Sequence, residues 1–147
     1  MFRLLAIVLN FSSSVCLAKS EGVVVTWYIT VSPMDTLGGE RESAKLVAFL
    51  RARPELIQTD AATFQGAPGQ PWLQIALVKT NGNGWIVHTG VVPALIDEVD
   101  MCCSYFEDEE WYESIAADIA RFLGWHAHEN AEGRQVWPPL PPASPLQ

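Results

Sequence analysis

Residues 99–125 read VDMCCSYFEDEEWYESIAADIARFLGW, and this stretch decides which fold the chain can adopt. In its second half, apolar residues recur three and four positions apart, which is typical of a helix with one apolar face. These residues are Trp111, Tyr112, Ile115, Ile119, Phe122 and Leu123. Asp108 suits an N-cap, and Gly124 followed by Trp125 is typical of a Schellman end. We therefore predict a helix over about 108–123.

The first half of the stretch alternates between two faces, as a half-buried strand does. Val99, Met101 and Cys103 share one face with Tyr105. A strand followed directly by a one-faced helix predicts a helix that lies on a sheet.

Composition indicates one folded domain with a substantial core. The chain has 147 residues, of which 49% are hydrophobic and 18% charged. Nine Lys and Arg against 17 Asp and Glu give a net charge of -8, which argues against a nucleic-acid partner. Half of the acids crowd into positions 97–118, where no Lys or Arg occurs. They are Asp97, Glu98, Asp100, Glu107, Asp108, Glu109, Glu110, Glu113 and Asp118.

This acidic stretch has two main interpretations, and the sequence leaves both open. It is either a solvated face that keeps a small protein in solution or a docking surface for a basic partner. A cluster of oxygen ligands for a cation is a third interpretation, but no calcium-binding loop pattern is present.

Residues 1–18 resemble a signal peptide. Arg3 supplies the positive start, 4–11 the apolar core, and Cys16-Leu17-Ala18 the small residues of a cleavage site. The apolar run is too short to span a membrane. The alternative is a start site assigned too early, with translation beginning near 23–25. The first interpretation predicts a periplasmic or secreted protein, and the second a cytoplasmic one.

The remaining elements follow from periodicity and turn residues. We predict strands over 23–31, 72–79, 85–89 and about 95–105, and a helix over about 40–52. The 40–52 helix has an apolar stripe of Ala44, Leu46, Val47, Phe49 and Leu50. A turn over 81–84, Asn-Gly-Asn-Gly, predicts that 72–79 and 85–89 form a hairpin. Residues 56–57 read as a short strand or a packed loop, and 59–71 as irregular.

After the 108–123 helix, we predict a small hairpin of 125–129 and 135–137, and a disordered Pro-rich tail over 138–147. The order β-α-β-β-β-α predicts an α+β fold over 19–137. It would be a two-layer sandwich, with a mainly antiparallel sheet and both helices on one face.

The sequence contains no constellation that predicts catalysis, so we expect no enzyme, no cofactor and no metal. No G-x-S-x-G, P-loop or dinucleotide motif is present. Cys102 and Cys103 are adjacent on a strand, so we expect no disulfide between them and two unpaired thiols. His126, His128 and Glu129 offer a pair of imidazoles but no third metal ligand with convincing spacing. His88 is expected to form a local hydrogen bond.

Residues 109–129, EEWYESIAADIARFLGWHAHE, resemble the C-terminal segment of small acidic immunity proteins of bacterial polymorphic toxin systems. These proteins commonly end in an acidic, aromatic-bearing helix closed by a Leu-Gly-Trp-like turn. The resemblance covers about a seventh of the chain. It implies a non-enzymatic protein that binds and blocks a cognate toxin.

We therefore expect an acidic binding protein, an inhibitor or immunity protein of a basic bacterial toxin or enzyme. The alternative is a structural or housekeeping α+β domain that forms a homo-oligomer; the sequence leaves the oligomeric state open. Neither nucleic acid nor a membrane is an expected partner. The expected contact residues are Asp97, Glu98, Asp100, Glu107, Asp108, Glu109, Glu110 and Glu113.

Overall fold

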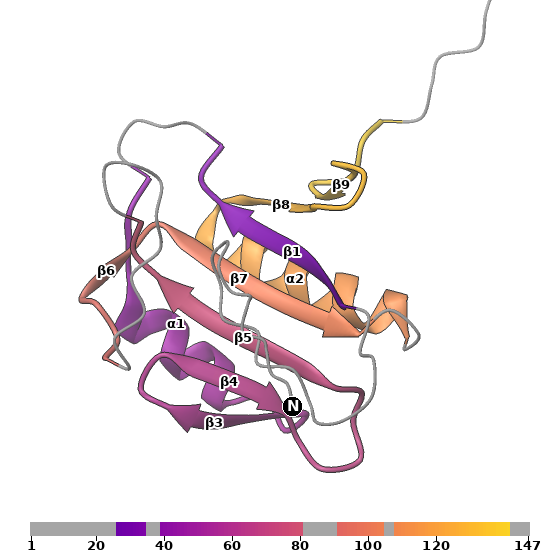
Figure 1. Ribbon diagram of the computed structural model, residues 1–147. Coiled ribbons are helices and arrows are strands. Elements are labelled where there is room, and N and C mark those ends of the chain that lie inside the picture. The colour runs from indigo at the N-terminus through magenta and orange to yellow at the C-terminus, as the bar shows by residue number, and fades with distance from the viewer. Residues whose placement is uncertain (1–25, 35–38, 81–90, 105–107, 142–147) are drawn as a thin grey trace, which may run out of the picture.

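The computed structural model describes residues 26–34, 39–80, 91–104 and 108–141. They form an α+β sandwich of a seven-stranded antiparallel sheet and two helices, which lie behind the sheet in Figure 1 and contact one another. The predicted fold class is confirmed. The chain runs β1 Thr26–Ser32, β2 Arg41–Glu42, α1 Ser43–Arg51, β3 Leu56–Asp60, β4 Thr63–Gly66, β5 Leu73–Val78, β6 Leu95–Ile96, β7 Glu98–Ser104, α2 Glu109–Leu123, β8 His126–Glu129 and β9 Gln135–Trp137.

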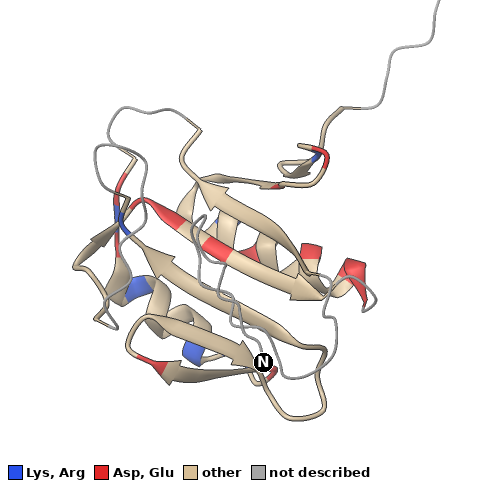
Figure 2. Ribbon diagram, viewed as in Figure 1, with Lys and Arg blue, Asp and Glu red and all other residues tan. Residues whose placement is uncertain are grey.

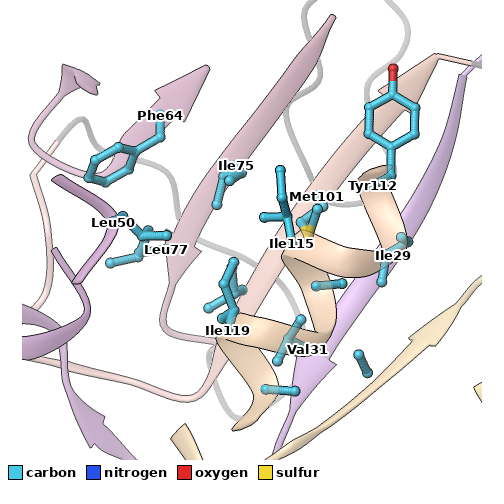
Figure 3. Packing of buried hydrophobic residues seen from close by; sticks show 14 of the residues in the cluster. Ile29, Val31, Leu50, Phe64, Ile75, Leu77, Met101, Tyr112, Ile115 and Ile119 are labelled. Carbon is cyan, nitrogen blue, oxygen red and sulfur yellow. The ribbon is translucent and has the colours of Figure 1, made fainter. Parts of the chain in front are cut away.

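The strands are ordered β3-β4-β5-β7-β1-β8-β9, and a separate two-stranded sheet pairs β2 with β6. Strand β7 is central, because β5 pairs with one of its edges and β1 with the other. Met101 lies opposite Ile75 on β5 and opposite Ile29 on β1. All three side chains are buried and face the helices, so this row forms the middle of the core (Figure 3).

Helix α2 covers the inner face of the central strands. Its buried residues are Tyr112, Ile115, Ala116, Ile119, Ala120 and Leu123. Figure 3 shows Ile115 and Ile119 beside Met101 and the β1 side chains. The prediction was wrong for Phe122, which is 44% exposed and stacks on Phe49 of α1 with 4.4 Å between ring centroids. Trp111 is only partly buried.

Tyr112 also fastens the start of α2 to the sheet. Its hydroxyl donates a hydrogen bond to the Trp72 carbonyl oxygen at 2.6 Å and accepts one from the Ser104 N–H at 3.4 Å. These two partners precede β5 and end β7. One buried hydroxyl therefore bridges two neighbouring strands and the helix.

The two ends of α2 behave differently. Asp108 occupies the N-cap position, but its side chain makes no capping bond; its carbonyl oxygen accepts from the Trp111 N–H at 3.2 Å. At the other end, Gly124 has φ 75°, and the Trp125 N–H donates to the Ala120 carbonyl oxygen at 2.9 Å. This is the six-to-one bond of the predicted Schellman end. Trp125 is buried, and its indole N–H donates to the Gly39 carbonyl oxygen at 3.0 Å.

Several local predictions need correction. Residues 59–71 are not irregular, because they include the end of β3 and all of β4. Helix α1 begins at Ser43 rather than near 40, and Ala44 of its predicted stripe is exposed. The predicted 95–105 strand is two strands, β6 and β7, separated at Asp97. The predicted hairpin of 125–129 and 135–137 is confirmed as β8 and β9.

Other predictions fall on residues that the structure does not describe. They are the segment 1–18, the start of the 23–31 strand, the 81–84 turn with its 85–89 return strand, and the tail beyond position 141. Strand β5, the first half of the predicted hairpin, is bordered by β4 and β7 instead.

The different burial of Ile119 and Phe122 on α2 predicts different effects of their substitution on stability. Ile119→Ala should lower the free energy of unfolding by about 2–5 kcal/mol, because Ile119 is fully buried and the change leaves a cavity. Phe122→Ala removes mainly an exposed ring stack and should cost only about 1 kcal/mol. Urea unfolding of both variants measures the difference. Equal losses would contradict the placement of Phe122 outside the core.

Candidate functional site

The acidic stretch of the sequence is divided in space. Asp97, Glu98 and Asp100 lie at the start of β7, whereas Asp108, Glu109 and Glu110 follow its far end (Figure 2). A seven-residue strand is about 20 Å long, so the two groups lie near opposite ends of the central strand. The expected contact residues therefore do not form one continuous surface. Glu107 lies outside the described residues.

Within the first group, the Asp97 carboxylate is bound by neighbouring residues. Its carboxylate accepts hydrogen bonds from the Thr80 N–H at 2.8 Å and from the Thr80 hydroxyl at 2.7 Å. Lys79 Nζ lies 3.7 Å from the same carboxylate and 2.6 Å from that of Glu40. Asp97 thus holds the end of β5 to the β6–β7 corner, and its charge is partly balanced within the chain.

Asp100 is buried on the face of β7 that points away from the helices, and its Oδ2 atom has no hydrogen-bond partner. Burial raises the pKa of this carboxyl well above its ordinary value, and the hydrogen bond and charge of Glu98 raise it further. A carboxyl that is covered and favours its neutral form is a poor contact for a basic partner. The structure therefore places Asp100 inside the protein rather than on a docking surface.

The second group contains the freely exposed acids. Asp108, Glu109 and Glu110 are all exposed, and none of them forms an ion pair with another described residue. The next acid along the helix, Glu113, is half-buried and paired with Arg134 of the β8–β9 turn. We call Asp108, Glu109 and Glu110 the α2 acidic end.

Two further acids serve the fold. Asp118 of α2 pairs with Arg53, which follows α1, at 2.8 Å, and Arg53 also pairs with Glu55 at 2.6 Å. Glu129 accepts backbone hydrogen bonds from the N–H groups of Ala131, Glu132 and Arg134 at 2.8–3.1 Å. These hydrogen bonds hold the turn that joins the two strands of the predicted 125–129 and 135–137 hairpin. The α2 acidic end differs from these sites because none of its three carboxylates forms an ion pair with a described residue, although the charge of Glu109 acts on Arg134 from a longer distance.

The cysteines have different states. Cys103 is free and buried, and burial raises the pKa of its thiol well above its ordinary value, with a smaller contribution from the charge of Glu113. Cys102 is disulfide-bonded, so the expectation of two unpaired thiols was wrong. Because Cys103 is free, the expected absence of a bond between these two neighbours is confirmed.

His126 and His128 lie on one face of β8, with their ring centroids 5.3 Å apart. Ser32 Oγ of β1 is 3.3 Å from His126 Nε2. Glu129 points to the opposite face and is engaged by the turn. In the described part of the chain, no group of three or more His, Cys, Asp or Glu could hold a metal ion. The sequence did not single out Ser32, because its pairing with His126 depends on the β1–β8 register. His88 lies outside the described residues.

Comparisons with protein-family models, curated proteins and solved structures found no match. The resemblance to immunity proteins therefore stays a prediction, and function must be argued from the residues themselves. Within the described ranges, neither helix is long and apolar enough to cross a membrane.

The raised pKa of Asp100 predicts how the free energy of unfolding depends on pH. A carboxyl whose pKa is raised in the folded chain stabilises the fold in acid, below its ordinary pKa, and this contribution is lost as the pH rises through the raised value. Asp100→Asn keeps the neutral shape. It should raise the free energy of unfolding at pH 7, because the variant has no buried charge at this position, and the gain should shrink in acid.

Urea unfolding between pH 4 and 7, about the ordinary carboxyl range and above, measures this effect. Glu129→Gln is the matched control of opposite sign. Burial raises the pKa of Glu129, but the backbone hydrogen bonds outweigh burial and lower it. Its variant should therefore lose stability at neutral pH and approach the parent in acid. An Asp100→Asn chain that is less stable than the parent at pH 7 would contradict the assignment.

Proposed function

We propose that the chain is a non-enzymatic binding protein that uses the α2 acidic end to dock a basic protein, and that it inhibits this partner as an immunity protein does. The observation that carries the proposal is that Asp108, Glu109 and Glu110 are all exposed and form no ion pair with a described residue. Every other acid of the 97–118 stretch within the described residues is buried, ion-paired or hydrogen-bonded to a neighbouring group; Glu98 is hydrogen-bonded to Asp100. An excess of charge concentrated at one exposed site speeds encounter with a partner of opposite charge.

Rigidity supports the same site. The α2 acidic end begins one turn before Tyr112, whose buried hydroxyl is bonded to the sheet. Trp111, which follows Glu110 directly, is partly buried and meets Tyr112 edge-on at 5.5 Å. Tryptophan is enriched among the residues that contribute most to binding at interfaces, and here a partly buried one lies beside exposed charges. The expected contact surface is therefore Asp108, Glu109, Glu110 and the open side of Trp111.

The resemblance of residues 109–129 to immunity proteins supports the choice of inhibitor over other binding roles. The net charge of -8 suits a basic toxin or enzyme as partner. A competing explanation is that acids in a first helical turn only stabilise α2 through its dipole, which is worth about 0.3–1 kcal/mol. The experiment must therefore separate an effect on binding from an effect on folding.

The test uses charge reversal with a matched control. Glu109→Lys with Glu110→Lys should weaken binding to the basic partner and flatten the salt dependence of its association rate, since rim charges act mainly on encounter. Glu42→Lys is the control, because Glu42 is also exposed and also stands at a helix start, as the N-cap of α1. It should leave binding close to that of the parent.

The partner is isolated with the full chain from the parent cell and identified by mass spectrometry. The decisive measurements use the purified pair: association rates at low and high salt, and the activity of the partner with and without the chain. Urea unfolding of each variant controls for helix stability. An affinity that is unchanged in the Glu109/Glu110 variant would overturn the docking site. A partner that stays fully active in the complex would overturn the inhibitor role.

A further inference from the structure

The geometry points to a two-histidine chelate on β8, in which His126 and His128 bind one late first-row divalent ion such as Zn²⁺ or Cu²⁺. This inference is independent of the proposed function, because it concerns another element and other chemistry. It also departs from the sequence-based expectation of no metal, which rested on the missing third ligand.

The strand register places both imidazoles on one surface. His126 lies opposite Ser32 and His128 opposite Thr30, and Thr30 is in turn paired with Asp100 on β7. Cross-strand partners point to the same side of a sheet, so both histidines lie on the face away from the helices. Each is half-buried, which keeps the side chain accessible while restricting its rotation.

The separation of the rings fits a shared ion. A Zn–N bond of about 2.0–2.1 Å places the ion about 3.2 Å from each ring centroid, so a tetrahedral angle sets the two centroids about 5.2 Å apart. The observed separation is 5.3 Å. The rings are tilted at 55° rather than stacked, so the pair is not a face-to-face contact that would exclude an ion.

Hydrogen bonding leaves ligand atoms available. His128 contacts the ring of His126, and its side chain makes no hydrogen bond among the described residues. His126 Nε2 faces Ser32 Oγ at 3.3 Å. When Nε2–H donates to this hydroxyl, the lone pair resides on Nδ1, which is how outer partners orient metal-bound histidines. Ser32 is thus a positioning residue.

The ligand set also limits the class of ion. Imidazole suits zinc, copper and nickel rather than magnesium or calcium. Glu129 supplies no ligand, because it faces the other side and its carboxylate serves the turn. Two protein ligands are one fewer than open zinc sites have, so the other positions are left to water or to a group of a bound molecule.

The test titrates the full chain, free of any histidine tag, with ZnCl₂ in a calorimeter. We expect one ion per chain. His126→Asn or His128→Asn should weaken binding about 100-fold, because the second ligand of a chelate acts at high effective concentration. Ser32→Ala should weaken it by up to about tenfold, the lower range for an outer-shell partner. His88 is the third histidine of the chain and is not one of the proposed ligands. His88→Asn is therefore the matched control and should bind Zn²⁺ like the parent.

A second measurement needs no variant. Substoichiometric Cu²⁺ should broaden the imidazole NMR signals of His126 and His128 before those of His88. The inference is overturned when the parent releases no heat with Zn²⁺, when either β8 variant binds Zn²⁺ as tightly as the parent, or when Cu²⁺ broadens all three histidines alike.

Discussion

The packing of α2 on the central strands is the interaction on which the other features depend. Strand β7 has both edges paired, so its inner face still needs cover, and α2 provides it. Ile115 and Ile119 provide that cover over Met101 (Figure 3). Burying one such side chain contributes about 1.5–3 kcal/mol, whereas an N-cap contributes about 0.5–2 kcal/mol. Since the Asp108 side chain makes no capping bond, packing rather than capping holds α2 in place.

This packing also decides where the acids lie. Helix α2 must return over the strand that precedes it, so its first turn stands beyond the end of β7, about 20 Å from the start of that strand. Acids that are near neighbours in sequence are thereby separated. Asp97 and Asp100 become part of the β6–β7 corner and the sheet, while Asp108, Glu109 and Glu110 remain exposed at the helix start. Charge density along a sequence is therefore a poor measure of charge density on a surface.

The sequence predicted the fold class and the extent of α2 because the signals there agreed with one another: the apolar spacing, the turn residues and the Schellman glycine. It failed where the decisive contacts are distant in sequence. Strand β4 reads TFQG among turn residues, and it is a strand because β5 and β3 pair with it. Phe122 fits the apolar period, but Phe49 of α1 gives it an alternative place outside the core. The Ser32–His126 contact depends on the β1–β8 register, which no local pattern encodes.

The α2 acidic end and the β8 histidines lie at opposite ends of one helix. Helix α2 has 15 residues and is about 20 Å long, and β8 begins three residues after it ends, at His126. This distance exceeds the Debye length of about 8 Å at physiological ionic strength, so charges at one end are largely screened from the other. Proximity therefore provides no electrostatic coupling between a basic partner at the helix start and an ion on β8. Any coupling would have to pass through α2 itself, whose buried face fits one arrangement of the core.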